Sequence, residues 1–168
     1  MSAKSKLLAT AVLLLAAHAW GAEIAAQYAC KATMNAERFA RALIDKRVVD
    51  GQPYSTADSI SYYAAKPGFT AFGLPLVAVT VFQEGSAFFH RAAGTSPGNI
   101  IGLVVQAGAG ELESAAGKQG VRVSNPKSMA YPQISVEWFE GSGYAPLPPP
   151  VEPRYKYAQL VCHIGFSK

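Results

Sequence analysis

The chain has 168 residues, half of them hydrophobic, with 15 Lys and Arg against 11 Asp and Glu and a formal net charge of +4. This length suits one domain with a substantial core. A nucleic-acid-binding surface needs a patch of basic residues, whereas the basic residues here are interleaved with acidic ones. Composition therefore predicts a single globular domain and argues against a nucleic-acid partner.

The first segment, residues 1–21, has the pattern of a cleavable signal peptide. Lys4 and Lys6 precede an apolar run of eleven residues, and small residues at an A-x-A spacing end at Ala19. A membrane-spanning helix would need about 20 apolar residues. We therefore expect cleavage after Ala19 or Gly21, a periplasmic or secreted location, and no membrane-spanning segment. Because the two lysines leave with the leader, 13 basic residues would remain against 11 acidic ones.

The two cysteines, Cys30 and Cys162, stand near opposite ends of the mature domain, residues 22–168. Outside the cytosol, an even number of cysteines is typical of disulfides. A metal site would need His or carboxylate partners at set spacings, and a lipid anchor would place its cysteine directly after the leader. We therefore predict a Cys30–Cys162 disulfide. In the chain-entropy model such a long loop stabilises the fold by at most about 5 kcal/mol.

The clearest predicted helix begins after Asn35, a favourable N-cap residue, and ends before Gly51 and Pro53. Its apolar residues recur at helical spacing, namely Ala36, Phe39, Ala40, Leu43 and Ile44. The next segment, residues 55–68, is ambiguous. Ser55 with Asp58 resembles a helical capping box, but its Ser, Ile and Tyr residues suit a strand equally well.

The rest of the chain favours strands. Residues 74–83 and 86–92 flank Glu84-Gly85, whose glycine suits a hairpin turn. The first of these strands is apolar on both faces, which is typical of a central strand. Further strands are predicted over residues 99–106, 120–124, 132–140 and 155–166, and a short helix or turn over 111–120. This order predicts an α+β domain with a largely antiparallel sheet and one main N-terminal helix packed on it.

A proline-rich stretch, residues 142–154, separates the last two predicted strands. It holds five prolines between positions 146 and 153, which favours a stiff polyproline II conformation. Such a stretch could be a ligand for an SH3-type groove, but domains that bind proline-rich segments in this way are mostly intracellular. We therefore predict a rigid strap across the surface of the sheet.

One motif resembles a catalytic nucleophile. Residues 94–98 read G-T-S-P-G and match the G-x-S-x-G elbow of α/β-hydrolases, with Ser96 at the nucleophile position. The residue after the nucleophile must donate its backbone N–H to the oxyanion, and Pro97 has none. Loss of one such donor costs on the order of 10²–10³ in rate. The motif therefore favours a turn.

No cofactor or metal site is predicted. The glycine-rich stretch over residues 108–119 matches neither the dinucleotide fingerprint nor the phosphate-binding loop. His90 and His163, the two histidines beyond the leader, stand at no metal-binding spacing, and a site built on both would still need a third ligand. They remain, with Ser96, the weak catalytic candidates.

Tyrosines give the clearest indication of a binding surface. Tyrosine buries a large area at low entropic cost and is enriched in interfaces, although it also suits half-exposed strand positions. Five tyrosines are the predicted binding residues, namely Tyr62, Tyr63, Tyr144, Tyr155 and Tyr157. They stand beside turns or the proline-rich stretch, where we expect side chains to stay partly exposed.

These observations predict an envelope protein that binds a protein or small ligand without catalysis, in the manner of an inhibitor or immunity-type protein. The alternative is a small envelope hydrolase that uses Ser96 or a histidine-based site. A third alternative is a passive structural component. No motif indicates a family or an oligomeric state.

Overall fold

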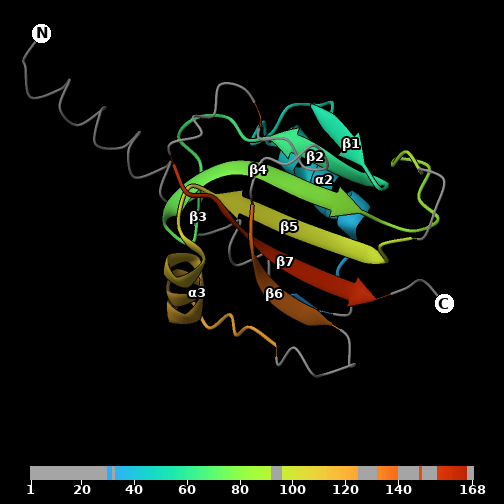
Figure 1. Ribbon diagram of the computed structural model, residues 1–168. Helices are drawn as coiled ribbons and strands as arrows, with labels where there is room; N and C mark the ends of the chain where they lie inside the picture. Colours follow the sequence, from blue (N-terminus) through green and yellow to red (C-terminus); the bar gives the residue numbers. More distant parts are fainter. Residues whose placement is uncertain are drawn as a thin grey trace, which may run out of the picture.

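An antiparallel sheet with helices on one side forms the framework of the molecule (Figure 1). The computed structural model describes residues 30–31, 33–91, 96–124, 132–139, 148 and 155–165. The predicted leader and all of the proline-rich stretch except Pro148 lie outside these residues. In the described part of the chain, the sheet has seven strands in the order β1-β2-β4-β5-β7-β6, and β3 pairs with β4 beside this path. The predicted α+β class is confirmed.

The elements have the following bounds. The helices are α2 (Ala36–Asp45) and α3 (Ala109–Lys118). The strands are β1 (Ser55–Ala57), β2 (Ile60–Ala64), β3 (Thr70–Ala71), β4 (Leu74–Phe82), β5 (Asn99–Val105), β6 (Gln133–Trp138) and β7 (Ala158–Gly165). Neither described helix has the length and apolar character that crossing a bilayer requires.

Helix α2 begins as predicted but ends earlier. The Asn35 side chain accepts a hydrogen bond from the Arg38 N–H at 2.7 Å, which caps the helix. After Asp45 the chain turns back, because Arg47 takes a left-handed φ of 58° and the Val48 N–H donates to the Leu43 carbonyl at 2.9 Å. Val48 is thereby buried in the core, so burial of this side chain takes precedence over a longer helix.

The ambiguous segment folds into the hairpin of β1 and β2. Asp58 and Ser59, which join the two strands, both have positive φ, 48° and 71°. Two successive left-handed residues match the twist of a tight hairpin, and aspartate tolerates this region better than most residues. Tyr62 and Tyr63 then point to opposite faces of the sheet, and both are buried.

The predicted hairpin between residues 74–83 and 86–92 is wrong. Gly85 does take a positive φ of 77°, but the chain then forms turns rather than a strand, and β4 pairs with β5 instead. The Phe89 ring packs against the Phe82 ring, with centroids 6.2 Å apart. This contact folds the loop back onto the end of β4. The short strand predicted over residues 120–124 is also absent, because residues 121–124 have no regular structure.

The two faces of the sheet are covered differently. On one face the helices pack over a large core, and Figure 1 shows α2 behind the sheet and α3 at one end of it. That core includes Val79, Val81, Ile101, Leu103 and Leu160 from the central strands. A smaller cluster covers the other face and comprises Tyr62, Ala78, Val104, Phe139 and Tyr157. Both faces of β4 and β5 are therefore buried, which confirms that these strands are central.

A polar contact is buried within this second face. The Gln159 side-chain amide on β7 donates to the Thr80 hydroxyl on β4, across the intervening strand β5. Gly102 of β5 lies beneath this hydrogen bond. A Cβ at that position would lie 2.1 Å from Thr80 Oγ1 and 2.2 Å from Gln159 Nε2. Only glycine leaves room for the two polar side chains to meet.

The predicted disulfide is present. Cys30 and Cys162 are bridged, with Cα atoms 5.5 Å apart, and the bridge joins the segment before α2 to strand β7. Cys162 pairs in register with Ile101 and Ile134, so it faces the core beneath the helices. Among the described residues there is no free cysteine.

Candidate functional site

A pocket of about 560 Å³ lies between α2, the β1–β2 hairpin and the loop after β4. We call it the α2 pocket. Its polar and aromatic lining comes from three separate parts of the chain. Helix α2 contributes Glu37 and Arg41, and the loop contributes Phe88 and His90. The segment from residue 51 through β2 contributes Gln52, Thr56, Ser61 and Tyr63.

Strand register explains why β2 lines this pocket. Ser61 pairs with Val81, and Tyr63 pairs with Val79. Because directly opposed residues share a face of the sheet, Ser61 and Tyr63 lie on the face that α2 covers. Both residues are buried and Tyr63 belongs to the core cluster, so they line the pocket at the edge of the core.

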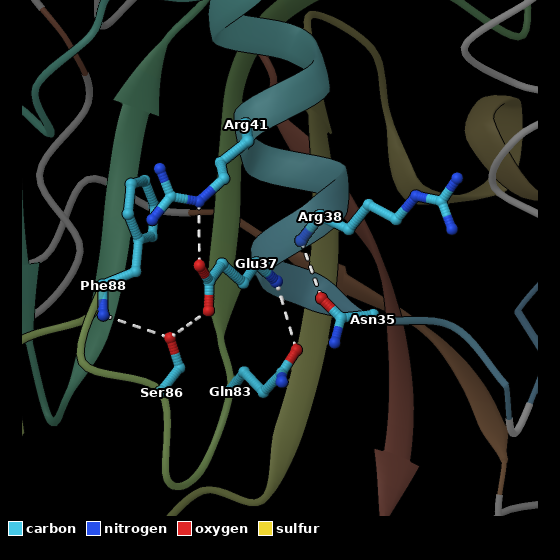
Figure 2. A network of polar contacts seen from close by, with 7 residues as sticks. All are labelled: Asn35, Glu37, Arg38, Arg41, Gln83, Ser86 and Phe88. Atoms are coloured by element: carbon cyan, nitrogen blue, oxygen red, sulfur yellow. Dashed lines mark hydrogen bonds and ion pairs between the residues drawn. The ribbon is translucent and has the colours of Figure 1, made fainter.

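Glu37 ties the loop to the helix, as Figure 2 shows. Its Oε1 accepts from Arg41 Nε at 2.8 Å, and its Oε2 accepts from the Ser86 hydroxyl at 2.6 Å. The Ser86 oxygen in turn accepts from the Phe88 N–H at 3.1 Å. The hydrogen bonds from Ser86 and then Arg41 lower the pKa of Glu37. Glu37 is therefore ionised. It binds Arg41 and Ser86 directly and holds Phe88 through Ser86.

The base of the loop is anchored as well. The Gln83 side-chain oxygen accepts from the Glu37 N–H at 3.2 Å, which satisfies a free amide in the first turn of α2. The Asn99 side chain accepts from the Glu84 N–H at 2.7 Å, which connects the loop to the start of β5. The loop is fixed at both ends of residues 83–88 although it is not a strand.

Arg41 lies across the face of the Phe88 ring, with its Cζ 4.3 Å from the ring centroid (Figure 2). Such a cation–π contact orients the guanidinium, and the Glu37 carboxylate fixes it from a second direction. The Arg41 side chain is nevertheless 56% exposed. Within the described residues, no acceptor takes a hydrogen bond from either Nη atom. The pocket therefore offers a positioned guanidinium with free donors.

Tyr63 stands within electrostatic range of this guanidinium. Burial raises the pKa of Tyr63, and the Arg41 charge opposes that rise. Tyr63 therefore stays a neutral phenol, which can donate a hydrogen bond. Among the described residues that line the pocket, no hydroxyl forms a hydrogen bond with His90. The arrangement suits binding better than nucleophilic catalysis, which needs a hydroxyl paired with a base.

The other catalytic candidates lie elsewhere. Ser96 stands just before β5, and its hydroxyl oxygen accepts from the Gly98 N–H at 3.2 Å. This contact, with a left-handed φ of 72° at Gly98, is a serine turn, as the sequence predicts. His163 lies on β7 and not in the α2 pocket with His90.

His163 has neighbours that sequence reasoning missed. The Ser135 hydroxyl on β6 donates to Glu137 Oε1 at 2.9 Å and lies 3.4 Å from His163 Nε2. The same Nε2 lies 3.9 Å from Glu137 Oε1. The nearby His163 imidazole lowers the pKa of Glu137, and burial opposes this shift. In a catalytic triad the two ring nitrogens contact the nucleophile and the acid separately, whereas here one nitrogen faces both.

The expected exposure of three predicted binding tyrosines is wrong. Tyr62, Tyr63 and Tyr157 are 6%, 3% and 4% exposed. Tyr62 packs against Phe139, with ring centroids 6.3 Å apart, because residues on either side of the proline-rich stretch cover this face of the sheet. Tyr63 instead lines the α2 pocket.

The other two predicted binding tyrosines are Tyr144 and Tyr155. Tyr155 is 43% exposed, so contact between this residue and a partner stays a prediction. Tyr144 lies outside the described residues.

In the described part of the chain, no three His, Cys, Asp or Glu residues gather in a metal-binding arrangement. No protein-family model matches the chain, and neither curated proteins nor solved structures give a significant match.

Proposed function

We propose that the protein is exported to the cell envelope and acts there by binding, without catalysis, a small ligand or an exposed group of a partner protein. The α2 pocket is the binding site. Export is supported by the sequence pattern of the leader and by the disulfide, since disulfides persist mainly outside the cytosol.

The single observation that carries the proposal is the network centred on Glu37. It holds Arg41 and Phe88 in one arrangement before any ligand arrives. A site that is already ordered loses less conformational entropy when it binds. Purely structural surface residues have no need of such order, because an exposed ion pair alone contributes little to stability.

A thermal-shift screen of small polar metabolites tests the proposal. Ala87 lines the pocket and is exposed, so Ala87→Trp fills the pocket without disturbing the core. Val123, an exposed residue outside the pocket lining, provides the matched control Val123→Trp. We expect at least one ligand that raises the Tm of the wild type and of Val123→Trp but not of Ala87→Trp. Equal shifts in all three proteins, or no ligand at all, would refute the proposal.

A small hydrolase is the second candidate function, favoured by the contacts of His163 with Ser135 and Glu137. Turnover of p-nitrophenyl esters tests it. Turnover that is lost in Ser135→Ala and kept in Ser96→Ala would support this candidate. Absence of turnover by the wild type would remove it.

A further inference from the structure

The charges in the α2 pocket restrict the chemistry of its ligand. Arg41 and Glu37 carry opposite charges, and both oxygens of Glu37 are already occupied by Arg41 and Ser86. Each carboxylate oxygen has a second lone pair, so Glu37 can still accept from a ligand, but it cannot donate.

The hydroxyls of Ser61 and Tyr63, the Gln52 amide and the His90 ring can each donate or accept. The charged donors in the lining are the Nη atoms of Arg41, to which no acceptor among the described residues is bonded. A ligand that carries a charged acceptor complements them.

The geometry of Arg41 favours a particular acceptor. Its Nε is held by Glu37, so the two Nη atoms are the part of the fork that is left for a ligand. A guanidinium binds a planar two-oxygen group through two parallel hydrogen bonds. Contact with Phe88 on one face keeps the guanidinium from turning away. These constraints match a carboxylate.

The lining of the pocket favours an organic carboxylate over inorganic phosphate. The pKa of Glu37 is lowered, so this residue is ionised at neutral pH and stands against the same guanidinium. The repulsion from Glu37 grows with the charge of the ligand, but the attraction to Arg41 grows in the same proportion, so charge alone does not separate the two anions. Apolar lining from Pro53, Ala87 and Phe88 can cover a short hydrocarbon or aromatic body.

We infer that the ligand of the α2 pocket carries a carboxylate, which Arg41 binds through its two Nη atoms. This inference rests on the proposed function of the pocket. The carboxylate can belong to a free organic acid or to the C-terminus of a peptide. The recognition chemistry is the same in both cases.

Titration by NMR tests this inference on the full mature chain with its disulfide intact. The probes are acetate, benzoate and N-acetylphenylalanine, each paired with its neutral amide, and inorganic phosphate. The readout is the Nε–Hε signal of Arg41, which reports directly on the guanidinium. We expect the acids to shift this signal saturably and the amides to leave it unchanged.

Substitution at Arg41 provides the second arm. Arg41→Lys keeps the charge but loses the fork, and it should weaken acid binding about tenfold or more, since hydrogen bonds to charged groups contribute about 1.5–3 kcal/mol. Arg38→Lys is the matched control, because Arg38 lies on the same helix outside the pocket lining. Its affinity should equal that of the wild type.

The outcomes separate the two proposals. Tighter binding of N-acetylphenylalanine than of benzoate would assign the site to a peptide terminus, and the reverse order to a free acid. Equal binding of acids and amides, no binding by any acid, or an unchanged affinity in Arg41→Lys would overturn the carboxylate inference, as would tighter binding of phosphate. If neutral ligands bind in a way that Ala87→Trp blocks, the proposed function stands and this inference alone fails.

Discussion

Two polar networks lie on opposite faces of the same sheet, in opposite surroundings. The hydrogen bond from Gln159 to Thr80 is buried and joins β7 to β4 across β5. The Glu37 network lies at the surface, where Arg41 remains more than half exposed. A buried polar group is costly unless it is paired, so the first network fixes how the strands pair. The second lies where an exposed ion pair contributes little to stability. Under the proposed function, its order serves to hold Arg41 in place for a ligand.

Loss of the disulfide should lower the free energy of unfolding more than loss of either polar network. Replacing both cysteines with serine (Cys30→Ser with Cys162→Ser) should lower the free energy of unfolding by about 2–5 kcal/mol, because the bridge restricts the unfolded chain. Chemical denaturation of the oxidised wild type and the double variant measures this difference. Quantitative alkylation of the native wild type without denaturant would show instead that the bridge is not formed.

Gly102→Ala breaks the buried network. The new Cβ would overlap both Thr80 Oγ1 and Gln159 Nε2, and such overpacking costs about 1–3 kcal/mol. We expect a loss near the upper end of this range, measured by denaturation. Gly108→Ala is the matched control, since a Cβ at Gly108 meets nothing within 4 Å. Equal effects at the two glycines would contradict the close approach.

A double-mutant cycle then isolates the hydrogen bond itself. Gln159→Leu leaves the buried Thr80 hydroxyl without this partner, which should cost about 1–2 kcal/mol, within the range for an unsatisfied buried group. Adding Thr80→Val removes the unsatisfied group, so part of the lost stability should return. Strictly additive losses in the two single variants and the double variant would show that the two side chains are not coupled.

Glu37→Gln breaks the exposed network and should have the smallest effect on stability. Because hydrogen bonds with Ser86 and Arg41 lower the pKa of Glu37, the contacts are present above the ordinary carboxyl pKa of about 4.3. They are lost as the pH falls through the lower pKa of the folded state. The protection factor of the Phe88 N–H, which compares its exchange rate with the intrinsic rate at the same pH, should therefore fall in the variant, and in the wild type at acidic pH.

The control for this prediction is Glu113→Gln, an exposed carboxylate on α3. It should leave exchange at Phe88 unchanged. If Glu37→Gln left exchange at Phe88 normal but greatly lowered the free energy of unfolding, the Glu37 network would stabilise the fold and would not order the loop. This result would contradict the comparison between the two networks.

Local sequence signals predict the elements that depend on near neighbours. Asn35 and the apolar spacing after it predict the start of α2, and the doubly apolar residues 74–83 predict a central strand. The cysteine pair was predictable from its number and position. In each case the physical cause lies within a few residues, or in a choice among very few partners.

The candidate site depends instead on contacts between distant parts of the chain. Phe88 reaches Glu37 and Ser61 because the loop folds back, through the packing of Phe89 on Phe82 and the hydrogen bond from Ser86 to Glu37. No local pattern distinguishes that loop from a second hairpin strand. The contact of Ser135 with His163 likewise requires knowing that β6 pairs with β7. The burial of Tyr62 follows from its contact with Phe139, 77 positions away.

Strand β7 has a consequence for how the chain reaches its native state. It enters the sheet between β5 and β6, although it follows both in the sequence. Until it is inserted, β5 and β6 have no shared partner, and their backbone groups on that side stay open to other chains. Folding rates fall as contacts become more distant in sequence, and unpaired strand edges favour aggregation. The rate-limiting step of folding is therefore expected to be the insertion of β7, which a fluorescent label or a φ-value series along this strand would detect.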